Sequence, residues 1–264
     1  MSDEIKSRVR KQFGENAHKY VTSAGHAKGQ DLAWLVEAAG AEPGMNALDV
    51  ATGGGHVANA LAPLVSRVTA LDMTEDMLQA AGQFIRGNGH SNVDFVPGDA
   101  EKLPFPNESF DLVTCRIAAH HFPHVRDFVA EAYRVTRTGG RLLLIDNVVP
   151  ESGEADRFYN EIECRRDPSH VRAWRKTEWI SMLESAGFRV ETMEVFRKNF
   201  VFTEWCERMA LPRAEQIKLE ETMLAAPDHL QRTFRFQSRE DGTLFGFEGE
   251  SMGIRVVKEQ TSLP

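Results

Sequence analysis

The sequence predicts an α/β protein built on a mostly parallel sheet with helices on both faces. Between about residues 47 and 149, short apolar runs alternate with helical stretches. This alternation is typical of parallel strands, which need a crossover helix between them. A glycine turn follows the first apolar run, and an acidic residue ends the second. Ligands of such sheets bind at the carboxyl ends of the strands, where both features lie.

Five strands are expected in this core, over residues 47–51, 67–72, 93–97, 110–116 and 141–147. The intervening helices are expected over 56–64, 75–86 and 124–135. Two helices precede the core, at about 2–13 and 28–39. Later segments predict helices near 154–165 and 176–186 and a strand at 188–196. A helical insertion follows over about 203–224, which Pro212 is expected to interrupt. The last strands are expected at 233–237, 244–247 and 253–258, as antiparallel additions to one edge.

Composition limits the possible partners. The chain has 264 residues and a net charge of −8, which argues against a nucleic-acid partner. Its three cysteines are far apart and have no Cys-x-x-Cys spacing, so a reducing cytoplasm is expected. The polar N-terminus shows no signal peptide, and no apolar run is long enough for a membrane span. We expect a single domain over 1–264 and draw no inference about oligomeric state.

Three motifs follow successive strands and together predict a nucleoside-bearing cofactor. Gly53-x-Gly55 follows the first strand, where a turn without Cβ atoms lets backbone approach a ligand. Asp72 ends the second strand, where a carboxylate can accept both hydroxyls of a ribose. Asp99 and Ala100 follow the third and can bind the edge of an adenine. The glycine spacing also satisfies the dinucleotide fingerprint, so an NAD-dependent oxidoreductase remains an alternative.

The chain resembles class I S-adenosylmethionine (SAM)-dependent methyltransferases. The resemblance rests on Leu48-Asp49-Val50-Ala51-Thr52-Gly53-Gly54-Gly55, on Leu71-Asp72-Met73-Thr74 and on Gly98-Asp99-Ala100-Glu101. The most similar group contains small-molecule enzymes like the ubiquinone/menaquinone-biosynthesis methyltransferases. The family often has glycine where this chain has Ala51. The resemblance implies a Rossmann-like fold with a seven-stranded sheet, a core at about 45–150, an N-terminal helical lid at 1–40 and the insertion at about 203–225.

The resemblance also implies site residues. The cofactor-binding set comprises Ala51, Thr52, Gly53, Gly55, Asp72, Met73, Asp99, Ala100, Arg116 and Tyr20. The cofactor itself would be S-adenosylmethionine. A protein that binds SAM without catalysis stays open as an alternative. A nucleic-acid methyltransferase is disfavoured, because Arg116-Ile117-Ala118-Ala119 stands where amino-methylating DNA enzymes carry an Asn/Asp-Pro-Pro-aromatic motif.

Methyl transfer requires the enzyme to position the acceptor and, where needed, to deprotonate it. His121 and His120 are candidate general bases, since histidine titrates near neutral pH. His26, His170 and Arg172 are candidate substrate-binding residues for a small-molecule acceptor. Packing or salt bridges are the alternative roles of these side chains. No metal is expected, because no carboxylate or cysteine completes a ligand set with His120, His121 and His124.

Overall fold

The computed structural model describes residues 2–14 and 29–259. Its centre is one sheet whose main path has the order β3-β2-β1-β4-β5-β9-β7. These strands span Asn46–Val50 (β1), Arg67–Asp72 (β2), Val93–Pro97 (β3), Phe110–Arg116 (β4), Thr136–Val149 (β5), Phe188–Val201 (β7) and Leu244–Lys258 (β9). The strands from β3 to β5 pair in parallel, whereas β9 runs antiparallel to both of its neighbours. The predicted α/β class and mostly parallel sheet are therefore confirmed.

Helices cover both faces of the sheet because the core strands are apolar on both sides. On one face, strand residues such as Leu142 and Leu144 pack against α7 (Val125–Val135) and α9 (Lys176–Ser185). On the other, Leu143 and Ile145 pack against α4 (Gln30–Ala39) and α5 (His56–Leu61). Ile85 of α6 (Glu75–Gly87) joins this second cluster. Alternate residues of β5 thus enter opposite cores, as the two-residue repeat of a strand requires.

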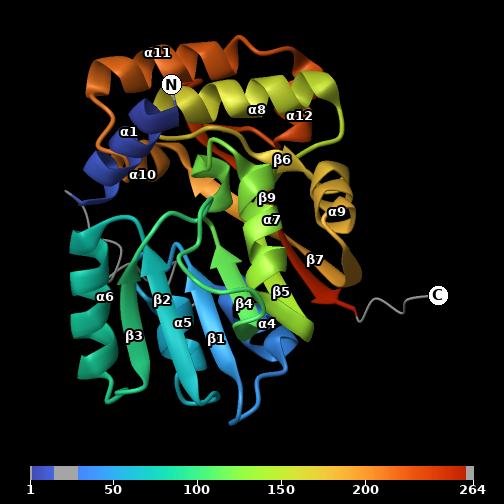
Figure 1. The fold of residues 1–264 in the computed structure, drawn as a ribbon. Coiled ribbons are helices and arrows are strands. Elements are labelled where there is room, and N and C mark those ends of the chain that lie inside the picture. The colour runs from blue at the N-terminus through green and yellow to red at the C-terminus, as the bar shows by residue number, and fades with distance from the viewer. Residues whose placement is uncertain (1, 15–28, 260–264) are drawn as a thin grey trace.

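A second layer of helices lies beyond the carboxyl ends of the parallel strands (Figure 1). It contains α8 (Gly153–Arg166), α10 (Phe202–Glu207), α11 (Arg213–Leu224) and α12 (Asp228–Thr233). This layer has its own apolar clusters, one around Trp205, Met223 and Phe247 and another around Tyr159 and Phe234. Helix α1 (Ser2–Gly14) lies at the same end of the molecule and contacts α6.

The C-terminal third differs from the prediction. Residues 244–258 form one continuous strand rather than two, and 228–233 form α12 where the predicted strand 233–237 would begin. Only Gln237–Ser238 of that region is extended, as β8 on the edge of β9. A further two-residue strand, β6 (Trp174–Arg175), pairs with β5. Pro212 interrupts the helical insertion as expected, standing at the N-cap of α11. No described helix is long and apolar enough to cross a membrane.

Candidate active site

A cavity of about 1030 Å³ opens at the carboxyl ends of β1, β2 and β3. It contains most of the residues that the sequence predicted for a cofactor. The predicted residues in its lining are Ala51, Thr52, Gly53, Asp72, Met73, Asp99, Ala100 and Arg116. The topology brings them together because β1 is flanked by β2 and β4, so the loops after these strands meet at one edge.

Asp72 joins the first two of the predicted motifs. Its Oδ2 accepts a hydrogen bond from the Gly53 N–H at 2.9 Å, and its Oδ1 accepts one from the Thr74 N–H at 2.9 Å. Burial raises the pKa of Asp72, and these backbone hydrogen bonds partly offset that effect. Each carboxylate oxygen has two lone pairs, so the group can still accept hydrogen bonds from a ligand in the cavity.

The turn after β1 has an unusual backbone. Ala51 has a φ of 53°, in the left-handed region that favours glycine. Glycine, which the resemblance leads us to expect here, adopts this conformation without strain. Gly55, in contrast, does not line the cavity, although it was predicted to bind cofactor. It faces α6, where an added Cβ would lie 2.9 Å from atoms of Ala81 and Ile85.

Asp49 also lines the cavity and was not predicted as a site residue. Its carboxylate accepts hydrogen bonds from the hydroxyls of Thr52 at 2.6 Å and Thr114 at 2.8 Å. Burial nevertheless raises its pKa to about 6. The sequence carried a signal for this residue, since an acid in the middle of an apolar strand must be buried with a partner.

Helix α1 lines one wall of the cavity through Lys6, Val9 and Phe13. The Lys6 ammonium lies 2.7 Å from the Asp99 carboxylate and 2.5 Å from that of Glu101. The expected adenine-binding carboxylate thus already has a cationic neighbour from the N-terminal helix. Helix α1, which is part of the predicted lid, therefore lines the cavity. Two predicted residues, Tyr20 and His26, lie outside the described residues.

A second and larger cavity adjoins the first. It lies between the sheet and the helical layer. Its lining includes His120 and Asn147 near the ends of β4 and β5, Lys198 on β7, and Trp205 on α10. The two cavities share Phe13, Arg116, Ile117 and His121.

A buried ion pair stands at this shared boundary. Arg116 at the end of β4 lies 3.0 Å from the Asp31 carboxylate of α4. Burial alone would raise the pKa of Asp31, but the guanidinium holds it below its ordinary value. The next residue, Ile117, has a φ of 54°, which a β-branched side chain rarely adopts. Backbone strain is therefore found beside both cavities, as is common at functional sites.

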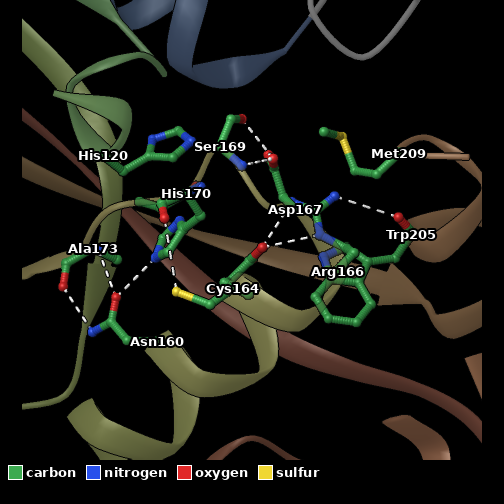
Figure 2. Close-up of polar contacts among 12 residues, drawn as sticks. His120, Asn160, Cys164, Arg166, Asp167, Ser169, His170, Ala173, Trp205 and Met209 are labelled. Atoms are coloured by element: carbon green, nitrogen blue, oxygen red, sulfur yellow. Dashed lines mark hydrogen bonds and ion pairs between the residues drawn. The ribbon is translucent and has the colours of Figure 1, made fainter. Parts of the chain in front are cut away.

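His121 lies where the cavities meet. It belongs to η1 (Ala119–His121), a short 3₁₀ turn after β4. Its Nδ1 lies 3.0 Å from the Ser169 carbonyl oxygen, which can only accept, so Nδ1 carries the proton in the neutral ring. Nε2 is then the basic nitrogen. The Ser169 hydroxyl in turn donates to Asp167 at 2.5 Å (Figure 2), which fixes the segment that holds the ring.

His120 lines only the second cavity. Its Nδ1 lies 2.5 Å from Oδ1 of the buried Asp146, and its backbone N–H donates to Oδ2 of the same carboxylate at 2.7 Å. Burial raises the pKa of Asp146 to about 6 and lowers that of His120 well below its ordinary value. Since Asp146 also accepts the Asn147 N–H at 2.7 Å, we assign the ring proton to Nδ1 and a neutral His120.

His170 and Arg172 are not among the residues that line the two cavities. The His170 ring lies beside that of His120, and its Nε2 is bonded to the Asn160 side chain at 2.9 Å (Figure 2). Burial lowers the pKa of His170 to about 3. Arg172 pairs with Asp156 and Glu178. The structure therefore gives both residues packing and ion-pair roles, the alternative noted from the sequence.

No group of three His, Cys, Asp or Glu side chains within 2–14 and 29–259 is arranged to hold a metal ion. The described site contains two adjoining cavities, buried carboxylates, His121 on the shared boundary and His120 in the second cavity. The sheet order and the position of the first cavity are those of the Rossmann-like class I methyltransferase fold.

Comparisons with known proteins agree with this class. A family model described as a methyltransferase domain matches residues 48–144. The uncharacterized methyltransferase YcgJ of Bacillus subtilis is 33% identical over 246 residues, which cover 93% of this chain and 97% of that protein. UbiE of Brucella canis, a ubiquinone/menaquinone biosynthesis C-methyltransferase, is 32% identical over 187 residues, covering 69% of this chain and 66% of that protein.

Solved structures extend the likeness to the whole fold. A protein of Bacillus halodurans C-125 described as a presumed methyltransferase is 49% identical, with a TM-score of 0.86. The structure of Bacillus subtilis YcgJ is 32% identical, with a TM-score of 0.85. Each comparison covers 88% of this chain and 100% of the other. The chain belongs to the methyltransferase family, which confirms the resemblance stated from the sequence and sets aside the nicotinamide alternative.

Proposed function

We propose that this protein transfers the methyl group of S-adenosylmethionine to a small-molecule acceptor. The observation that carries the proposal is the shared boundary of the two cavities at Arg116, Ile117 and His121. A cofactor in the first cavity and an acceptor in the second would meet there. The net charge of −8 supports a small molecule over a nucleic acid as acceptor.

In this proposal, the first cavity holds the cofactor through groups at the ends of three strands. Asp72 accepts the ribose hydroxyls, Asp99 and Ala100 bind the adenine edge, and Met73 packs against its ring. The backbone from Ala51 to Gly53 surrounds the methionine moiety. When bound, S-adenosylmethionine would supply a methyl group on a positively charged sulfur: the acceptor's nucleophilic atom would bond to the methyl carbon in line with the carbon–sulfur bond, which breaks to release S-adenosylhomocysteine.

The second cavity positions the acceptor and excludes water from it. His121 is the proposed general base, because its Nε2 is the basic nitrogen of a ring on the shared boundary. His120 lies one residue away, oriented by Asp146, and is a second candidate for proton transfer within the acceptor cavity.

The three cysteines are unpaired thiols, which supports the expected reducing cytoplasm.

The test is transfer of label from methyl-tritiated S-adenosylmethionine to the small-molecule fraction of a bacterial extract. We expect labelled product with the native protein and at least tenfold less with Asp72→Ala at a cofactor concentration below saturation. Binding of S-adenosylmethionine with no transfer to any fraction would contradict the proposed activity and favour a SAM-binding protein without catalysis.

A further inference from the structure

Lys198 is a cation of the second cavity that has no role in the function proposed above. It lies on β7 between Phe196 and Phe200. Because alternate side chains of a strand share a face, these three side chains lie on one side of β7. All three are half-buried, whereas the intervening Arg197 and Asn199 are exposed, although all five residues line the second cavity.

The two aromatic neighbours of Lys198 each pack against a different helix. The Phe196 ring lies 6.0 Å from that of Trp34 on α4, and the Phe200 ring lies 6.4 Å from that of Trp205 on α10. Lys198 thus stands at the interval between two helices that cover the same strand. All three residues line the second cavity, so Lys198 stands between two aromatic residues along this part of the cavity wall.

Two arginines of this cavity, Arg116 and Arg166, have carboxylate partners. Arg116 is paired with Asp31 at 3.0 Å, and Arg166 with Glu163 at 2.7 Å. Lys198, in contrast, has no carboxylate within ion-pair distance among the residues that the structure describes. The Lys198 ammonium has three N–H donors. It donates one long hydrogen bond, of 3.4 Å, to the Asn147 side-chain oxygen.

The nearest acidic groups are already engaged. Asp146, beside Asn147, accepts two hydrogen bonds from His120 and one from the Asn147 backbone. Asp31 is held by Arg116. Burial lowers the pKa of Lys198, as expected for an ammonium that has left bulk water without a close counter-ion. The free energy of this site improves if a ligand supplies the missing acceptor.

We propose that Lys198 binds an ionised oxygen of the methyl acceptor, and that Phe196 and Phe200 hold the acceptor's flat apolar body beside it. This inference deepens the proposed function and rests on it. The acceptor class is a small ring-containing molecule that carries a carboxylate or another ionised oxygen. Its charged end lies at Lys198 and its methyl-accepting end at the boundary marked by His121.

The experiment uses benzoate and its neutral analogue benzamide as probes. Binding of each to the full-length protein is measured by ligand-observed NMR or calorimetry, with and without saturating S-adenosylhomocysteine. The variants are Lys198→Met, which removes the charge at similar length, and Lys198→Arg, which keeps it. Lys218→Met is the matched control, because Lys218 lies on the exposed surface of α11 in an ion pair with Glu215. Thermal melting establishes that each variant is folded.

We expect the native protein and Lys218→Met to bind benzoate at least tenfold more tightly than benzamide. Lys198→Met should abolish this preference, and Lys198→Arg should retain most of it. Equal binding of the two probes to the native protein, no binding of either at 10 mM (about the weakest affinity such a contact would give), or an unchanged preference in Lys198→Met would overturn the proposal. Failure of S-adenosylhomocysteine to bind would instead contradict the proposed function, since the probes are also tested without it.

Discussion

The Asp72 carboxylate accepts a hydrogen bond from the Gly53 backbone at 2.9 Å, which joins the end of β2 to the glycine turn after β1. One side chain thereby fixes the geometry of two loops that line the first cavity. The same carboxylate faces the position at which a ribose is expected. Its removal should therefore affect cofactor binding more than any other single change in the cavity.

Asp72→Ala should weaken binding of S-adenosylhomocysteine at least tenfold, because two hydrogen bonds to a charged acceptor are lost, each contributing about 1.5–3 kcal/mol. Calorimetric titration measures this directly. Asp94→Ala is the control, since Asp94 lies on the neighbouring β3 but pairs with Arg67 at the exposed surface. Unchanged affinity in the Asp72 variant would remove this residue from the site.

Ala51→Gly should stabilise the fold by about 0.5–1 kcal/mol, because relief of the left-handed strain at φ 53° exceeds the entropy that glycine adds to the unfolded chain. Urea denaturation measures the free energy of unfolding. Ala60→Gly is a matched control, because Ala60 lies within helix α5 and is half-buried, and it should lose about 1 kcal/mol. A loss of stability in Ala51→Gly would show that the strain is not relieved by removing the Cβ.

His121→Gln should lower kcat at least tenfold with an acceptor identified by the labelling screen, while binding of S-adenosylhomocysteine changes less than twofold. The reason is that the ring lies at the boundary of the cavities, where a general base acts on the acceptor and contributes typically 10²–10⁴-fold. Full activity in this variant would exclude His121 as the base.

His170 gives the protein a specific sensitivity to acid. Its folded-state pKa of about 3 lies below the ordinary value of 6.5, so it stays neutral when folded and becomes charged when unfolded. Its contribution to stability is present above about pH 6.5 and is lost as the pH falls toward 3, by up to about 1.4 kcal/mol per pH unit.

The free energy of unfolding of the native protein should fall between pH 7.5 and pH 5.5. In His170→Gln this fall should be smaller by about 1 kcal/mol, as measured by urea denaturation at both pH values. His229→Gln is the control, because His229 is exposed and pairs with Glu154 at the surface. An identical pH dependence in native protein and His170→Gln would show that His170 is not held neutral by its surroundings.

The sequence predicted the core of this fold because its signals are local. Apolar runs ending in Gly53, Asp72 and Gly98 specify strands and their loops, and parallel topology places those loops together. The cofactor cavity follows from these features. The long strand β9 was instead predicted as two strands, 244–247 and 253–258, although the glycines of this segment are compatible with one continuous strand. They permit close approach: a Cβ at Gly246 would lie 2.4 Å from the Phe200 carbonyl oxygen.

The acceptor cavity was less predictable because its contacts join distant parts of the chain. Asp146 and His120 are 26 residues apart and meet only because β4 and β5 are neighbours. Lys198 belongs to no sequence motif. That no carboxylate of the described residues pairs with it is seen only in the folded structure, where α4 and α10 pack on β7. Conversely, Arg172 was predicted to bind substrate, whereas the structure pairs it with Asp156 and Glu178.

The central claim is that the first cavity binds S-adenosylmethionine. The most direct test is calorimetric titration of the purified protein with S-adenosylmethionine, S-adenosylhomocysteine and NADH in parallel. The account predicts binding of the first two at micromolar concentrations, about −8 kcal/mol, and no measurable binding of NADH. Binding of NADH alone would contradict the account and redirect the search for an activity to redox substrates.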